Sequence, residues 1–124
     1  MDRHQRVILL IDDDPDYRLA VRQILEAHGF RVVEAEDGES GLRVFREHTP
    51  DLVIVDLMME EIDSGVQFMK EVRGMHPNTP VYLMSSVGDS LSMTTNAAQL
   101  GFTGVLQKPV NSARLVAVMD SHLR

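Results

Sequence analysis

The sequence predicts an α/β fold in which helices cover both faces of a parallel sheet. Five short runs rich in apolar residues recur along the chain, and stretches with helical periodicity lie between them. The connections are short, and no linker or internal repeat interrupts the alternation. Strands and helices that alternate in this way form parallel sheets with right-handed crossovers, so we expect one doubly wound (βα)5 domain over residues 1–124.

The first predicted strand is Val7–Ile11, which stops at three consecutive aspartates. The last of these, Asp14, precedes Pro15, and this pair is typical of a helix N-cap followed by proline at the first helical position. Asp14 is therefore expected to cap a helix and not to bind a ligand. Gly29 should lie just beyond the end of this helix. Its core-facing side is predicted to consist of Tyr17, Ala20, Val21, Ile24 and Leu25.

The middle of the chain continues with a second strand over Phe30–Ala35, a turn at Asp37-Gly38 and a helix over Glu39–His48. The next run, Leu52–Val55, is wholly apolar and ends abruptly at Asp56. A run of this kind is typical of a strand that is buried on both faces in the middle of a parallel sheet.

The remaining elements repeat the same pattern. They are a helix over Gly65–Met75, a strand over Val81–Met84, a helix over Asp89–Leu100, a strand over Phe102–Leu106 and a helix over Asn111–Leu123. The helix over Asp89–Leu100 is rich in Ser, Thr and Asn, which are mediocre helix formers, so we expect it to be held loosely.

The last predicted helix has more apolar residues than one core-facing stripe needs. Leu115, Val116 and Met119 form the stripe, and Ala117 and Val118 are expected outside it. These two residues are either ordinary surface or a patch for a partner, so a homodimer is kept as an alternative.

Composition excludes several classes of protein. The 124 residues include 19 acidic and 12 basic ones, the formal net charge is −7, and no Lys/Arg cluster is visible, so direct nucleic-acid binding is not expected. The absence of cysteine excludes disulfides and thiolate metal sites. The first apolar run is too short for a signal peptide or a membrane span, and we expect a cytoplasmic protein.

Side chains that can carry chemistry follow four of the predicted strands. They are Asp12 and Asp13 after the first strand, Asp56 after the third, Ser85 after the fourth and Lys108 after the fifth. In a parallel sheet these ends lie along one edge, where open α/β sheets bind ligands. Two carboxylates about 4 Å apart repel by roughly 4 kcal/mol at an effective dielectric constant of 20, so three of them need a cation. Oxygen ligands without Cys or His favour Mg²⁺.

An aspartate beside Mg²⁺, a lysine and a hydroxyl group can act as the nucleophile in phosphoryl transfer, because that chemistry mainly requires positioning and neutralisation of charge. Lys108 and Ser85 would then contact the phosphoryl group. Ser86 is adjacent and could replace Ser85 in this role, although Ser85 is preferred.

Four motifs occur in a specific order: LLIDDD at the first strand, LVIVDLMM at the third, a hydroxyl residue after PVYLM, and KP near the end. With these motifs the whole chain resembles the response regulator receiver domain of two-component signalling. The resemblance implies a flavodoxin-like sheet with the strand order 2-1-3-4-5. It also implies phosphorylation of Asp56, with Mg²⁺ held by Asp13, Asp56 and the main-chain carbonyl of Met58, and with Asp12 acting through water.

The resemblance further implies that Ser85 and Lys108 contact the phosphoryl group and that the Lys108-Pro109 peptide bond is cis. The donor would be a sensor histidine kinase or a histidine phosphotransfer protein. Phosphorylation would change the surface formed by the fourth helix, fifth strand and fifth helix, and an unknown output partner would detect this change. The chain would be a phosphoacceptor and not an enzyme.

Several residues depart from the family pattern. Glu60 and Ser64 stand where the family usually has proline and glycine, and Val105 stands where an aromatic switch residue is frequent. Met58 and Val87 occupy positions that influence hydrolysis of the acyl phosphate in this family. Both are apolar and cannot orient a water molecule, so we hypothesise slow self-dephosphorylation.

Two rival functions stay open. One is a receiver-like scaffold that is never phosphorylated. The other is a small haloacid-dehalogenase-like phosphatase that uses Asp12 and Asp14, although Pro15 starts a helix immediately and Asp56 would then have no role. A flavin-binding module is weaker still, because acidic residues and not a phosphate-binding loop follow the first strand.

Overall fold

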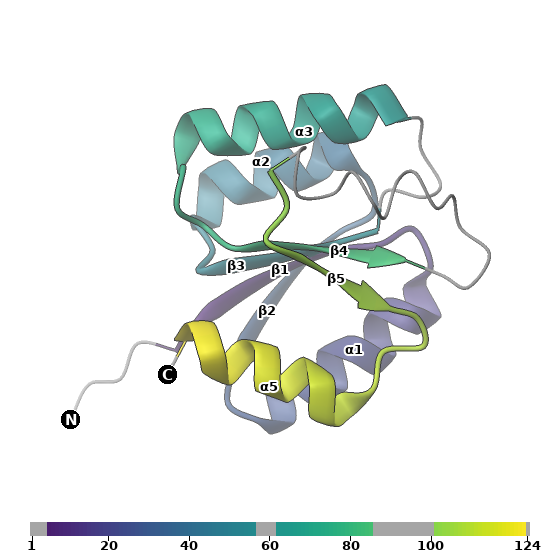
Figure 1. Ribbon diagram of the computed structural model, residues 1–124. Helices are drawn as coiled ribbons and strands as arrows, with labels where there is room; N and C mark the ends of the chain where they lie inside the picture. The colour runs from purple at the N-terminus through teal and green to yellow at the C-terminus, as the bar shows by residue number, and fades with distance from the viewer. Residues whose placement is uncertain (1–4, 57–61, 86–100, 124) are drawn as a thin grey trace.

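The computed structural model describes residues 5–56, 62–85 and 101–123, with the main chain alone for residues 62–66 (Figure 1). Its elements in chain order are β1 (Val7–Ile11), α1 (Pro15–Ala27), β2 (Arg31–Ala35), α2 (Gly38–His48), β3 (Leu52–Val55), α3 (Ile62–Met75), β4 (Val81–Ser85), β5 (Gly104–Gln107) and α5 (Ser112–Leu123). The helix predicted over Asp89–Leu100 lies outside the described residues.

The five strands form one parallel sheet in the order β2-β1-β3-β4-β5. Helices α2 and α3 cover one face of this sheet, and α1 and α5 cover the other (Figure 1). Every residue of Leu52–Val55 is buried, as predicted for a central strand. The predicted doubly wound α/β fold and its strand order are therefore confirmed.

The sheet separates two hydrophobic cores. Successive side chains of a strand point to opposite faces, so alternate residues of β1 belong to different cores. Leu9 packs with Phe45 in the core under α2 and α3. Its neighbour Ile8 packs with Leu25 and Leu115 in the core under α1 and α5. Each face of the sheet is thereby closed by its own pair of helices.

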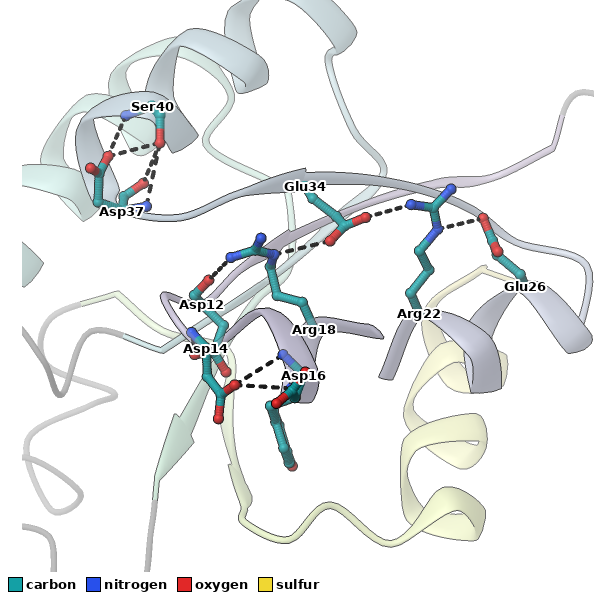
Figure 2. Close-up of polar contacts among 10 residues, drawn as sticks. Asp12, Asp14, Asp16, Arg18, Arg22, Glu26, Glu34, Asp37 and Ser40 are labelled. Carbon is teal, nitrogen blue, oxygen red and sulfur yellow. Dashed lines mark hydrogen bonds and ion pairs between the residues drawn. The ribbon is translucent and has the colours of Figure 1, made fainter. Parts of the chain in front are cut away.

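Two aspartates fix the starts of the helices that leave the carboxyl edge of the sheet. Asp14 Oδ1 accepts hydrogen bonds from the N–H groups of Asp16 at 3.0 Å and Tyr17 at 3.3 Å, so its predicted capping role is confirmed. Asp37 caps α2 by accepting from the Ser40 N–H at 2.8 Å, while its own N–H donates to the Ser40 hydroxyl at 3.3 Å (Figure 2). These bonds satisfy main-chain donors that a helix start leaves without internal partners.

Two elements begin two or more residues away from their predicted start, and the other predicted bounds differ from the observed ones by at most one residue. Helix α3 begins at Ile62 and not at Gly65, because the helix continues through the glycine that was taken as its start. Strand β5 begins at Gly104 and not at Phe102. The Phe102 side chain is buried in the core under α2 and α3, and the Thr103 N–H already bonds to β4 before regular pairing begins.

The predicted helix faces are wrong at two positions. Val118 is only 6% exposed and packs in the core under α5, whereas the prediction left it outside the apolar stripe. Ala20 was predicted to face the core but is exposed. On α5 the buried stripe is wide enough to include both Val118 and its neighbour Met119. Of the two residues suggested as a contact patch for a second copy of the chain, Val118 is therefore buried and only Ala117 is exposed.

Candidate phosphoacceptor site

Three side chains from separate strand ends meet at the carboxyl edge of the sheet. The Lys108 ammonium lies 3.1 Å from Asp12 Oδ2 and also bonds to Asp56 Oδ2. Asp12 is fully buried, Asp56 is 7% exposed, and the Lys108 side chain is 16% exposed. The lysine is 96 residues from Asp12 and 52 from Asp56 along the chain, so only the fold brings the three together.

Burial and charge act in opposite directions at this cluster. Burial raises the pKa of the Asp12 carboxyl above its ordinary value, and the Asp56 charge adds to this; the Asp14 N–H and the Lys108 ammonium reduce the rise. Burial alone would lower the pKa of Lys108, but its hydrogen bonds to Asp56 and Asp12 raise that pKa by more. Lys108 is therefore a firmly charged ammonium at neutral pH.

The sheet itself holds these residues in register beyond the ends of the strands. The Asp56 N–H donates to the Ile11 carbonyl at 2.8 Å, and the Lys108 N–H donates to the Ser85 carbonyl at 2.7 Å. These bonds continue the parallel pairing of β3 with β1 and of β5 with β4. The main chains of Asp56 and Lys108 are thus fixed by hydrogen bonds of the same kind as those that build the sheet.

Ser85 ends β4 and is 3% exposed. It lies at a cavity of about 370 Å³ whose other lining residues, within the described part of the chain, are Val105, Gln107, Pro109, Asn111 and Arg114. Asp13 follows Asp12 and is exposed. Ser86 and Met58 lie outside the described residues, so the choice between Ser85 and Ser86 and the carbonyl ligand of Met58 stay predictions.

The chemistry of the donor set suits Mg²⁺. Asp12, Asp13 and Asp56 offer only hard oxygen atoms as ligands. The two buried carboxylates, those of Asp12 and Asp56, already bind one positive charge between them, the ammonium of Lys108. Within residues 5–56, 62–85 and 101–123, no three carboxylate or imidazole groups converge as a ready metal cluster. The expected ligand set also includes Met58, which is not among these residues.

Among the positions that depart from the receiver pattern, Val105 is the one whose side chain the structure describes, and it is partly buried against the core under α2 and α3. Glu60 and Val87 lie outside the described residues, as does the side chain of Ser64. The Lys108-Pro109 peptide bond is cis, as the resemblance implied. No helix in the described part of the chain is long and apolar enough to cross a membrane.

Two residues next to the site were not predicted to serve it. The ring of Tyr17 lies beneath Lys108, with 4.4 Å between Nζ and the ring centroid. The Arg18 guanidinium donates a hydrogen bond to the Asp12 main-chain carbonyl at 2.5 Å. Both residues lie in the first turn of α1, immediately after the aspartates, and this position is the one signal in the sequence that could have indicated them.

Comparison with known proteins agrees with this geometry. The profile of the response regulator receiver domain matches residues 8–120. The chemotaxis protein CheY of Bacillus subtilis (strain 168) is 33% identical over 117 residues, which are 94% of this chain and 96% of CheY. The transcriptional regulatory protein GlrR of Escherichia coli (strain K12) is 38% identical over 116 residues, but the chain spans only 26% of GlrR. It spans 49% of the transcriptional regulatory protein CpxR from the same strain, at 35% identity.

Solved structures give the same result. A receiver domain protein of Clostridium thermocellum superposes with a TM-score of 0.85 at 29% identity, covering 95% of this chain and 94% of that one. The chemotaxis response regulator CheY4 of Vibrio cholerae has a TM-score of 0.82 at 26% identity, with 97% of this chain and all of that chain covered. From the fold, the acidic site with its lysine and these matches together, we conclude that the chain belongs to the response regulator receiver domain family of two-component systems.

Proposed function

We propose that the chain is a phosphoaccepting switch and that Asp56 receives the phosphoryl group. The proposed donor is the phosphohistidine of a sensor histidine kinase or of a histidine phosphotransfer protein. The observation that carries this proposal is the ammonium of Lys108 shared between the carboxylates of Asp12 and Asp56 at the carboxyl edge of the sheet. Membership in a family of phosphoacceptor domains supports it.

The proposed step is an in-line transfer. A carboxylate oxygen of Asp56 forms a new bond to phosphorus while the bond from phosphorus to the donor imidazole nitrogen breaks and the imidazole takes up a proton. Lys108 neutralises charge beside the attacking carboxylate, and its ammonium can turn to the oxygen atoms of the transferred group. The buried position of Asp56 limits access of water to its carboxylate.

Receiver domains generally require Mg²⁺, and here the residues proposed to hold it are Asp13, Asp56 and the Met58 carbonyl, with Asp12 acting through water. The ion would neutralise charge on the phosphoryl oxygens. Ser85 is proposed to contact the phosphoryl group, since its residue ends β4 beside the Lys108 main chain. Residues 1–124 are proposed to be a single receiver domain.

The way in which phosphorylation is passed on to a partner protein is a proposal as well. The chain spans nearly all of CheY but only about a quarter of GlrR and about half of CpxR, so the activities of those whole proteins are not transferred. We propose that a partner detects a change in β5 and α5 together with the segment before them. Lys108 follows β5 directly, and Asn111, just before α5, and Arg114, in the first turn of α5, line the Ser85 cavity. This arrangement offers a short route from the site to that surface.

The decisive experiment is incubation with acetyl phosphate and Mg²⁺ followed by intact mass measurement. One added phosphoryl group is expected on the parent chain and none on Asp56→Asn. An equal gain in mass on both would mean that another residue accepts the group. A parent chain that stays unmodified would favour the unphosphorylated scaffold.

The phosphatase alternative makes a different prediction. A haloacid-dehalogenase-like enzyme would hydrolyse a phosphate ester over many turnovers, and this activity would survive Asp56→Asn. We expect no such turnover by either protein, because the proposed role of the chain is to carry the phosphoryl group itself.

A further inference from the structure

Tyr17 makes two separate contacts with the segment that carries Lys108. The face of its ring lies 4.4 Å from Lys108 Nζ, measured to the ring centroid. Its hydroxyl oxygen accepts a hydrogen bond from the Val110 N–H at 2.9 Å, across 93 residues of sequence. One side chain of α1 therefore contacts both the ammonium of the site and the main chain two residues beyond it.

We infer that Tyr17 is a positioning residue for phosphoryl transfer, acting through Lys108. This inference rests on the proposed phosphorylation of Asp56. A lysine side chain has four flexible carbon-carbon bonds and loses much conformational freedom when it is fixed. Its ammonium here bonds to Asp12 and Asp56 on one side, and the aromatic face of Tyr17 attracts it on another. The ring thus limits the volume that the ammonium can visit.

The attraction between an ammonium and a ring face suits a lysine that has to change partners. It is electrostatic and depends weakly on the direction of the N–H bonds. Lys108 can therefore rotate its donors from the two carboxylates toward phosphoryl oxygens without leaving the ring. A hydrogen-bonding partner in the place of the ring would favour one orientation and oppose this change.

The hydroxyl group of Tyr17 has a different task. Tyr17 and Val110 both pack against the core under α1 and α5, and the bond between them joins the start of α1 to the loop that leads into α5. This bond sets the path of the main chain just after Lys108. The ring acts on the ammonium and the hydroxyl on the loop, so the two contributions can be separated by substitution.

The test measures the rate of phosphorylation by acetyl phosphate in Mg²⁺. Tyr17→Leu, which removes ring and hydroxyl, is expected to lower the rate constant by about three- to tenfold, the range that loss of one partly buried ammonium–ring contact corresponds to. Tyr17→Phe keeps the ring and should stay within about twofold of the parent. As a matched control, Tyr82→Phe removes a hydroxyl that bonds to His122 away from the site and should leave the rate unchanged.

A double-mutant cycle separates positioning from a merely structural role. If Tyr17 acts through Lys108, then Tyr17→Leu has no further effect on the rate once Lys108→Ala is present. The same fold-loss in both backgrounds would overturn the inference. A parent chain that is not phosphorylated at all would instead overturn the proposed function, and the inference with it.

A second measurement covers the case in which Tyr17→Leu fails to fold. Phenylalanine with increasing numbers of ring fluorines at position 17 keeps the shape of the ring while weakening the negative charge of its face. The rate is expected to fall stepwise with fluorination, and it should not do so in the Lys108→Ala background. A rate that is independent of fluorination would overturn the role of the ring.

Discussion

The Arg18 guanidinium holds the main-chain carbonyl of Asp12 by a hydrogen bond of 2.5 Å, and the same guanidinium is paired with Glu34 of β2 at 3.0 Å. Glu34 also bonds to Arg22, which in turn pairs with Glu26 on α1 (Figure 2). The main chain of a buried site residue is therefore tied to a chain of ion pairs that links α1 to the edge strand of the sheet.

Replacing Arg18 by Ala is expected to lower the phosphorylation rate of the protein by about three- to tenfold, because the freed Asp12 carbonyl loses one charge-assisted bond. Arg22→Ala is the matched control, since it breaks ion pairs of the same network but contacts no site residue. The free energy of unfolding should fall by no more than about 1 kcal/mol in the Arg22 variant, because the Arg22 side chain is 41% exposed and solvent screens its ion pairs. Equal rates for the two variants would contradict a role for Arg18 in the site.

Asp12→Asn should raise the free energy of unfolding at neutral pH in EDTA. The pKa of this carboxyl is raised in the folded state above its ordinary value of 3.8, so the folded chain loses stability as the pH rises from 3.8 through the folded-state pKa. Asparagine has the same shape but no charge. Urea denaturation at a series of pH values should give a gain at neutral pH that shrinks as the pH approaches 3.8. A gain that is constant with pH would contradict this origin.

Removal of metal gives a separate prediction for Asp13. Mg²⁺ at 100 times its dissociation constant should stabilise the parent chain by about 2.7 kcal/mol, and Asp13→Ala should abolish most of this gain. In EDTA the variant is expected to melt at a higher temperature than the parent, since one repelling carboxylate is gone. Thermal melts with Mg²⁺ and with EDTA measure both effects. An undiminished gain from Mg²⁺ in the variant would exclude Asp13 as a ligand.

Asp37 should contribute to stability mainly as a cap of α2. Asp37→Ala is expected to cost about 1 kcal/mol, whereas Asp37→Asn should retain most of the cap. Its bonds from the N–H and the hydroxyl of Ser40 lower the pKa of the Asp37 carboxyl, so the contribution is full above the ordinary value of 3.8 and declines as the pH falls below it. Urea denaturation of the three proteins tests this. An alanine variant as stable as the parent at neutral pH would contradict it.

Two glycines within helices should respond to alanine in opposite ways. A Cβ atom on Gly41 of α2 would overlap Ile11 Cδ1 and lie 3.1 Å from its Cγ1, and Ile11 is fully buried, so Gly41→Ala should cost about 1–3 kcal/mol. A Cβ atom on Gly74 of α3 would meet nothing within 4 Å. Gly74→Ala should therefore stabilise the chain by up to about 1 kcal/mol. Calorimetry would measure the melting temperatures of both variants. A shift of the melting temperature in the same direction for both would contradict this prediction.

The residues at the carboxyl edge of the sheet could be predicted from the sequence, because the apolar runs that form strands end at polar residues such as Asp12 and Asp56. Asp12, Asp56 and Lys108 meet for that reason alone: parallel strands bring their carboxyl ends together, whatever their separation along the chain. The cap at Asp14 was equally local, since proline and the aspartate before it specify a helix start within two residues.

Contacts that depend on the rotation of a helix about its axis, or on the direction of a side chain within the core, could not be predicted in this way. Whether Val118 or Val116 faces the sheet depends on the rotation of α5 by less than one residue step, and the apolar pattern allows both. The ring of Tyr17 was expected in the core, yet its hydroxyl partner lies 93 residues away. Nothing local in the sequence distinguishes a tyrosine that fills space from one that also contacts the ammonium of Lys108.

The site is complete only in the fully folded chain, because the ammonium of Lys108 is shared between Asp12 and Asp56. The two carboxylate partners of the ammonium lie 96 and 52 residues away and follow β1 and β3, whereas Lys108 itself follows β5. Contacts between such distant residues form only after long loops have closed, which is the slow part of folding. A chain with β5 undocked would keep Asp12 and Asp56 but would lack their counter-charge. The proposed phosphorylation of Asp56 should therefore track the population of native chains, and incompletely folded chains are expected to stay unphosphorylated.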